Sequence, residues 1–236
     1  MPHTDHNITQ SIPTLVNGVV REPSRSKVEL SNTNAGNMLN HINELKTELT
    51  TQRNSYSVNK KHKIICIGDS HTRGFSKILS NLMGDKFDLY GVVLPDSNSN
   101  QLLETACQQI NNLSSDDILV ICSGKNDLST NNSTLAFQNI SNMVSTNNHT
   151  HIVLINVPHR YDTTNSNATN HDIRKFNKKL EKLTKISPHA SFLKTEQNRQ
   201  LFTKHGLHYN NSGKHCLLHQ LALKIYSVTV QKPHVL

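Results

Sequence analysis

The chain has 236 residues, a formal net charge of +8 and a mean hydropathy of -0.53. This length allows one α/β domain with an appendage or at most two small domains, and the low hydropathy predicts that part of the chain does not join the core. No apolar run approaches the roughly 20 residues that span a membrane, and Met1 to Val20 lack the apolar segment of a signal peptide. We therefore expect an intracellular protein, cytoplasmic or nuclear, with no membrane partner.

The four cysteines include no Cys-x-x-Cys pair. Cys66 and Cys122 lie in apolar, strand-like runs, where a free thiol behaves as a small hydrophobic side chain. His215 and His219 have the i, i+4 spacing of a helical metal pair, but no carboxylate or Cys-x-x-Cys partner accompanies them. We expect free thiols, no metal and no organic cofactor.

The chain begins with residues 1–34, which are polar and show no periodicity, so we predict a disordered tail. From Ala35 to Gln52 apolar residues recur at alternating steps of three and four, which predicts an amphipathic helix followed by a linker up to Lys61. Such a helix can either dock on the domain or self-associate as a short coiled coil. Its apolar seam consists of Ala35, Met38, Ile42, Leu45 and Leu49.

From residue 62 to residue 230 predicted strands and helices alternate, and residues 231–236 form a C-terminal tail. Alternation of this kind predicts one α/β domain with a five-stranded parallel sheet and helices on both faces. The strands are expected near Ile64–Ile67, Lys86–Val93, Ile118–Cys122, His151–Val157 and Ala190–Leu193. The helices are expected near Phe75–Met83, Ser99–Asn112, Thr134–Ser145, His171–Ile186 and Ser212–Ser227.

The first of these strands ends abruptly in a serine. Ile64–Ile67 is an apolar, mostly β-branched run typical of a strand buried on both faces, and Gly68 permits a tight exit. Ser70 then lies at the carboxyl end of a parallel strand, where open α/β folds bind ligands. By itself such a serine is more often a helix cap than a nucleophile.

Three further blocks follow strands or precede a helix, and all four should meet at one edge of the sheet. The blocks are Gly68–His71, Gly91–Ser97, Ser123–Asp127 and His205–Asn210. In this order and spacing they resemble the SGNH (GDSL-like) hydrolases over roughly Lys63 to Val228. The resemblance implies a flavodoxin-like three-layer α/β/α sandwich and a serine esterase without a cofactor.

The resemblance also implies roles for individual residues. Ser70 is expected to be the nucleophile and His208 the general base, while the Asn126 side chain and the Ser70 N–H donate hydrogen bonds to the oxyanion. Gly124, the glycine of the third block, and Asp96, at the position of the second block's glycine, complete the candidate catalytic positions.

Two positions depart from the family pattern. An aspartate usually precedes the catalytic histidine by three residues, and this position is His205. The expected arrangement is therefore a Ser70–His208 dyad, oriented by a backbone carbonyl or by another carboxylate. At the second departure, Asp96 keeps a backbone N–H but brings a negative charge near the developing oxyanion.

The expected substrate is an acetyl or short acyl ester of a small molecule or a glycan. Arg73, Arg160 and His205 are candidates for the substrate cleft. The alternative is a non-catalytic module of this fold that binds RNA or a protein, because the net charge of +8 favours weak nucleic-acid binding.

Three strings narrow the resemblance further. They are His71–Gly74, Val157–Asp162 and Phe202–His208. Their amino-acid sequences resemble those of arthropod SGNH-like proteins that are often associated with mobile elements. In such proteins the esterase-like domain can follow a coiled-coil segment. The predicted helix from Ala35 to Gln52 is consistent with that arrangement.

Overall fold

The computed structural model describes residues 26–55, 61–164 and 166–230. The chain divides into two units, residues 1–38 and residues 39–236. The predicted tail up to residue 25, most of the predicted linker and the C-terminal tail lie outside the described residues.

Helix α1 (Ser26–Ser55) is longer than predicted. It begins nine residues before Ala35, in a polar stretch whose lack of apolar periodicity hid it from the sequence pattern. In the second unit, Ile42, Leu45 and Leu49 are buried. A cavity of about 750 Å³ lies beside this seam. It is lined by residues of α1, α2 (Phe75–Met83) and α7 (Asn211–Val230). These three side chains are thus covered by other residues of the second unit.

The sheet has five parallel strands in the order β2-β1-β3-β4-β5. They are β1 (His62–Gly68), β2 (Phe87–Val93), β3 (Ile118–Cys122), β4 (His151–Ile155) and β5 (Ala190–Leu193). The three central strands are buried along almost their whole length, whereas the edge strand β2 is half exposed. Strands covered by helices on both faces need continuous apolar runs, which is why the sequence revealed them.

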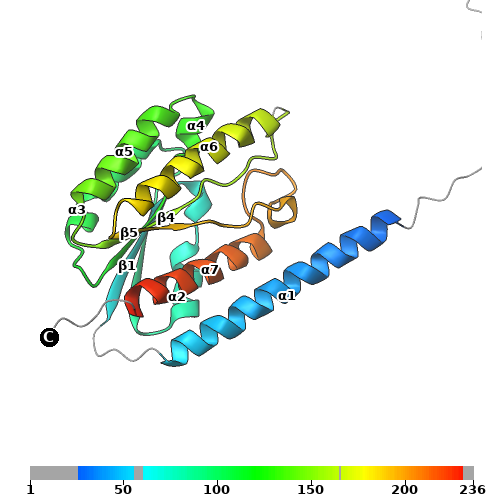
Figure 1. The fold of residues 1–236 in the computed structure, drawn as a ribbon, viewed down its shortest axis with the longest axis horizontal. Helices are drawn as coiled ribbons and strands as arrows, with labels where there is room; N and C mark the ends of the chain where they lie inside the picture. Colours follow the sequence, from blue (N-terminus) through cyan, green and yellow to red (C-terminus); the bar gives the residue numbers. More distant parts are fainter. Residues whose placement is uncertain (1–25, 56–60, 165, 231–236) are drawn as a thin grey trace, which may run out of the picture. The chain divides into compact units, whose positions relative to one another are not determined.

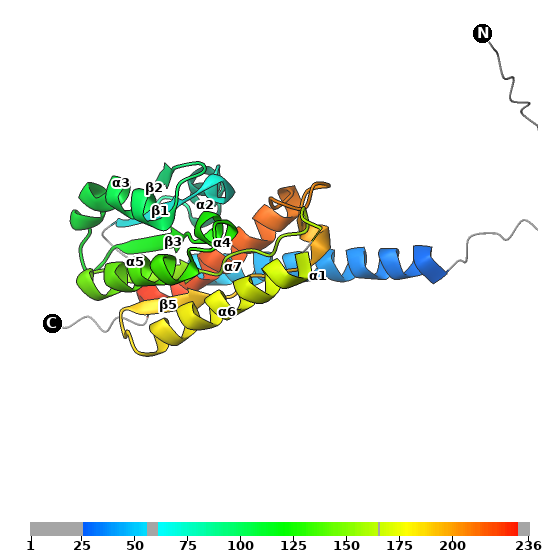
Figure 2. The same ribbon diagram turned by 90° about the horizontal axis from the view of Figure 1, so that it is seen from above.

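Helices cover both faces of the sheet, which confirms the predicted three-layer α/β/α sandwich (Figures 1 and 2). One face carries α3 (Ser99–Asn111), α5 (Ser133–Thr146) and α6 (Ser166–Lys185), and α2 and α7 cover the other. The predicted bounds of the domain match or differ by at most three residues, except that α6 begins five residues early. The short helix α4 (Lys125–Ser129) and the 3-10 helices Ser70–Thr72 and Arg199–Leu201 were not predicted.

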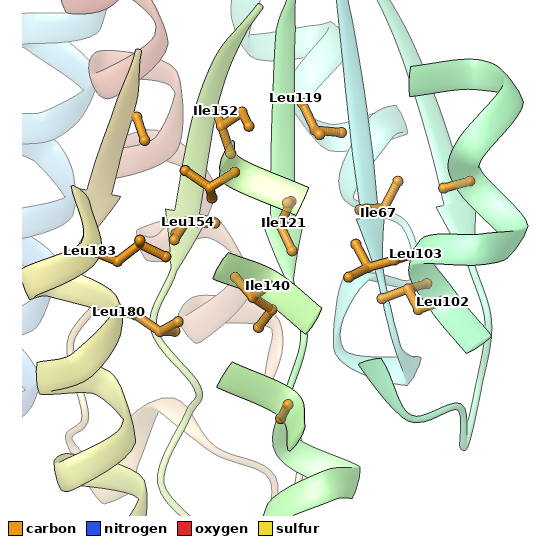
Figure 3. Packing of buried hydrophobic residues seen from close by; sticks show 14 of the residues in the cluster. Ile67, Leu102, Leu103, Leu119, Ile121, Ile140, Ile152, Leu154, Leu180 and Leu183 are labelled. Atoms are coloured by element: carbon orange, nitrogen blue, oxygen red, sulfur yellow. The ribbon is translucent and has the colours of Figure 1, made fainter. Parts of the chain in front are cut away.

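The main core lies between the sheet and the α3, α5 and α6 layer. Figure 3 shows Ile121 and Leu154 of the central strands facing Ile140 of α5 and Leu180 of α6. Because interiors of this kind are close-packed, a missing side chain leaves a cavity that the surroundings fill only partly.

The strand register determines where the loops emerge. Gly68 at the end of β1 pairs with Val93 of β2 and with Cys122 of β3, so the three strands end at the same level. From β1 the chain crosses to β2 on one side and then returns to β3 on the other. Ligands of open α/β sheets bind at this reversal of strand order. The loops that carry Ser70, Asp96 and Asn126 all start there.

The core makes a first prediction about stability. Leu154→Ala removes a side chain that is 1% exposed and should lower the free energy of unfolding by about 2–5 kcal/mol. The control Leu135→Ala removes a side chain that is 52% exposed, and it should change this free energy by less than about 0.5 kcal/mol. Urea denaturation measures both; equal losses would contradict the described packing.

Candidate active site

Ser70 stands in a tight turn at the end of β1. A Cβ on Gly68 would lie 2.3 Å from the Thr72 Cγ2 atom and 2.7 Å from the Cys122 carbonyl oxygen, so only glycine fits before the turn. The Asp69 carbonyl accepts hydrogen bonds from the backbone N–H and the hydroxyl of Thr72. The turn leaves Ser70 half-buried at the reversal of strand order.

The Ser70 hydroxyl lies beside the imidazole of His208. The distance from Ser70 Oγ to His208 Nε2 is 3.1 Å, across 138 residues of sequence. Burial, followed by the positive charges of His71 and Lys125, lowers the pKa of His208. The ring is therefore neutral at pH 7, and its Nε2 can accept the hydroxyl proton when Nδ1 carries the hydrogen.

The loop that carries His208 is held by its backbone. The Thr203 N–H donates to the His208 carbonyl at 2.8 Å, and the Tyr161 N–H donates to the Gly206 carbonyl at 3.0 Å. Gly206 has φ of 81° and no room for a Cβ against Tyr161. Within the described residues no carboxylate forms a hydrogen bond with His208, and His205 is exposed.

A carboxylate is nevertheless linked to this loop indirectly, through the side chain of His71. Asp69 Oδ1 accepts from the His71 backbone N–H at 2.9 Å and from His71 Nδ1 at 3.0 Å. His71 Nε2 donates to the Leu207 carbonyl at 2.9 Å, and the His71 and His208 rings lie 4.8 Å apart. The peptide groups on both sides of the His208 Cα atom are thus hydrogen-bonded.

The two acceptors determine the charge of His71. A carbonyl only accepts hydrogen bonds, and so does an ionised carboxylate, so both ring nitrogens carry hydrogens and His71 is an imidazolium. Burial alone would raise the pKa of Asp69, but the hydrogen bonds and charge of His71 outweigh it and lower this pKa. Asp69 and His71 therefore form a buried ion pair under the loop.

Asp96 has a backbone conformation that favours glycine. Its φ is 59°, in the left-handed region that glycine adopts readily. Its side chain is exposed, and neither its N–H nor that of Ser70 forms a hydrogen bond in the described part of the chain. Both N–H groups are therefore available to an oxyanion.

Asn126 is fixed by the neighbouring loop. Its Nδ2 donates to the Ser97 carbonyl at 2.8 Å, and its second amide hydrogen has no partner among the described residues. Asp127 accepts from the backbone N–H and the hydroxyl of Ser99 at 2.9 and 3.0 Å. Gly124 starts α4 with φ of 109°, and a Cβ there would lie 2.8 Å from the Phe176 ring. Gly124 thus allows the tight turn into α4, the helix that carries Asn126.

The three cleft candidates differ in position. Arg160 forms a two-pronged ion pair with Asp162, at 3.0 and 2.7 Å, on a loop that Asn170 holds through hydrogen bonds to the Arg160 backbone. The charges of Arg160 and Asp162 both act on Lys125. Arg73 and His205 are exposed, and no hydrogen bond between described residues joins either side chain to Ser70 or His208.

The sequence analysis left the side chains of Lys125, His71 and Asp127 without roles, although all three stand in the recognised blocks. All three are buried. One signal in the sequence could have found them, because each is an ionisable residue within a block that holds a proposed catalytic residue. Burying an ionisable side chain without a partner costs free energy, so such a residue is expected to have a partner or a role in the site.

Comparisons with known proteins agree with this geometry at the level of the fold. No protein-family model matches the sequence, and no curated protein matches it. Among solved structures, a GDSL-like lipase from Bacteroides thetaiotaomicron is 18% identical, with a TM-score of 0.59, covering 78% of this chain and 98% of that one. The catalytic domain of a peptidoglycan O-acetyltransferase from Streptococcus pneumoniae is 15% identical, with a TM-score of 0.54, covering 74% and 97%. A Bacteroides fragilis protein described as an acylhydrolase is 19% identical, with a TM-score of 0.60, covering 73% and 90%.

The chain therefore has the SGNH (GDSL-like) hydrolase fold, as its four blocks predicted. Ser70, Asp96 and Asn126 follow the in-register ends of strands at the reversal of strand order, with His208 against Ser70. Similarity to arthropod mobile-element proteins stays a prediction. Over the ranges that the structure describes, no helix has the length and apolarity needed to cross a membrane.

The Asp69–His71 ion pair makes a prediction about stability and pH. Asp69→Asn removes one partner of a buried pair and should lower the free energy of unfolding by about 3 kcal/mol at pH 7. Because folding lowers the pKa of Asp69, its contribution is present above the unfolded-state value of about 3.9 and disappears as the pH falls. Urea denaturation at a series of pH values from 7 downward should show that the difference in free energy of unfolding between the wild-type protein and Asp69→Asn becomes smaller.

The matched control is Asp88→Asn, which removes an exposed ion pair with Lys61 at 3.3 Å. Its effect should stay below about 1 kcal/mol. If Asp69→Asn behaves like this control, the pair does not stabilise the loop.

Proposed function

We propose that this protein is a serine ester hydrolase that cleaves an acetyl or short acyl ester of a small molecule or a glycan. The observation that carries the proposal is the 3.1 Å approach of Ser70 Oγ to Nε2 of a neutral His208. A hydroxyl is a weak nucleophile until an adjacent base takes its proton, and this pair supplies both groups. The likeness to lipases and acyltransferases in fold supports the same reaction class.

The reaction follows from this geometry in two steps. His208 Nε2 takes the Ser70 proton as Oγ attacks the ester carbonyl, and then returns it to the leaving alcohol, which leaves an acyl group on Ser70. Water repeats the sequence and releases the acid. Hydrogen bonds from Asn126 Nδ2 and from the N–H groups of Ser70 and Asp96 would stabilise the oxyanion, and each such donor is typically worth about 10²–10³ in rate.

The surroundings of His208 predict a slow enzyme. When the ring takes the proton it becomes a cation close to the imidazolium of His71 and the ammonium of Lys125, which repel it. In a serine protease, neutralising the carboxylate that supports the histidine lowers kcat about 10⁴-fold. Here the Asp69 charge offsets part of the repulsion, because it favours the protonated form of His208.

The first functional prediction concerns the nucleophile. A fluorophosphonate probe should label the wild-type protein and not Ser70→Ala, and hydrolysis of p-nitrophenyl acetate should fall to background in that variant. Ser129→Ala, which removes an exposed hydroxyl bonded to the Asn126 carbonyl, is the matched control and should keep the labelling. Labelling that survives in Ser70→Ala would exclude Ser70 as the nucleophile.

The second functional prediction concerns pH. The base is active when neutral, and the pKa of His208 lies below the ordinary value of about 6.5. The kcat/KM of ester hydrolysis should therefore rise with pH to a midpoint below about pH 6.5 and be level at pH 7. A pH series with p-nitrophenyl acetate measures this, and a midpoint above pH 7 would contradict the assignment of His208.

The alternative is a non-catalytic module that binds RNA. Its support is a hollow of about 580 Å³ between α6 and the end of β5, lined by Arg174, Lys178, Lys194 and His159, although Glu181 and Glu196 also line it. RNA binding that weakens steeply with salt, in a protein that no fluorophosphonate labels, would favour this alternative.

A further inference from the structure

The Lys125 side chain is largely buried, and its ammonium has no direct partner among the described residues. It stands between Gly124 and Asn126 at the start of α4 and is 9% exposed. In the described part of the chain its ammonium forms no hydrogen bond and no ion pair within 4 Å. The Nζ atom itself is not fully enclosed, so it can reach a solute that enters the site. An ammonium with three donors and no protein partner among the described residues is suited to bind an anion.

The charges around Lys125 do not neutralise it by contact. Those that act on it most strongly are Asp69, Arg160, Asp162 and Asp96. Asp69 is paired with His71 at 3.0 Å, and Asp162 is paired with Arg160 at 2.7 Å. Asp96 is exposed to water. When each pair is counted as neutral, Lys125 and the exposed Asp96 are the charges of this group that remain.

Lys125 also lies beside the reacting groups. The next residue, Asn126, is the proposed oxyanion donor, and the Lys125 charge acts on both His208 and Asp69. A group bound by this ammonium would therefore lie within electrostatic range of His208, the proposed base. Lysine binds anions as a compact charge with three donors, so carboxylates, sulfates and phosphates all match it.

We propose that Lys125 binds an anionic group of the substrate, so that the preferred ester carries a carboxylate or a similar small anion close to the scissile carbonyl. This inference rests on the proposed hydrolase function. A purely structural Lys125 would affect folding but would not discriminate between charged and neutral esters.

Two pairs of esters test the proposal and locate the anion. Monoethyl succinate and ethyl butyrate differ by a carboxylate on the acyl side, whereas acetoxyacetate and ethyl acetate differ by one on the alcohol side. NMR measures their hydrolysis by the wild-type protein and by Lys125→Met, Lys125→Arg and the control Lys182→Met, which changes an exposed lysine of α6.

For at least one pair, the wild-type protein should prefer the anionic ester at least 10-fold in kcat/KM. Lys125→Met should reduce this preference about 10- to 100-fold, the range of a charge-assisted hydrogen bond. Lys125→Arg should retain part of it, and Lys182→Met should retain it all. A wild-type protein that prefers neutral esters in both pairs overturns the proposal even if Lys125→Met does not fold.

A binding measurement separates this proposal from the hydrolase proposal. Monoethyl succinate and acetoxyacetate should shift NMR signals of the site in Ser70→Ala, and the additional change Lys125→Met should abolish the shifts. If no ester is hydrolysed but this binding occurs, the hydrolase proposal fails and the anion site stands. If neutral esters are hydrolysed and neither anion binds, the anion site fails and the hydrolase proposal stands.

Discussion

The alignment of three strand ends is the constraint on which the candidate site depends. Gly68 pairs with Val93 on one side and with Cys122 on the other, so the loops after β1, β2 and β3 start at one level. Asn126 then bonds the second loop through the Ser97 carbonyl, and Asp127 bonds the start of α3 through Ser99. A slip of one residue in a parallel pair would turn every side chain to the other face and separate these groups. The buried apolar strands therefore position the polar groups.

The electrostatics of the site differ from those of a complete serine hydrolase triad. The position three residues before His208 holds an exposed histidine, and Asp69, a carboxylate whose charge acts on His208, is hydrogen-bonded to His71. The imidazolium of His71 holds the Leu207 carbonyl and so positions His208 through its backbone. This arrangement orients His208 but opposes its protonated form, because the repulsion from neighbouring cations offsets the favourable charge of Asp69.

An anionic substrate would alter that balance. Lys125 and His71 both oppose a positive charge on His208, and a carboxylate bound to Lys125 would cancel one of the two. The substrate would then contribute part of the charge that the missing aspartate supplies elsewhere. A site that is slow on neutral esters and faster on anionic ones is the expected result of this arrangement, and it gives the buried lysine a reason to stay charged.

The sequence by itself determined the sheet, most of the helices and the order of the blocks, because apolar periodicity and glycine turns are local properties of the chain. It also proposed Ser70, Asn126 and His208 as candidates, since their blocks follow a shared pattern. It missed α4, the early start of α1 and the surroundings of the His71 and Lys125 side chains. Only the tertiary structure decided these, because they depend on contacts between distant segments: His71 meets Leu207 across 136 residues. The absence of a partner for Lys125 within the described residues likewise shows only once the chain has folded around it.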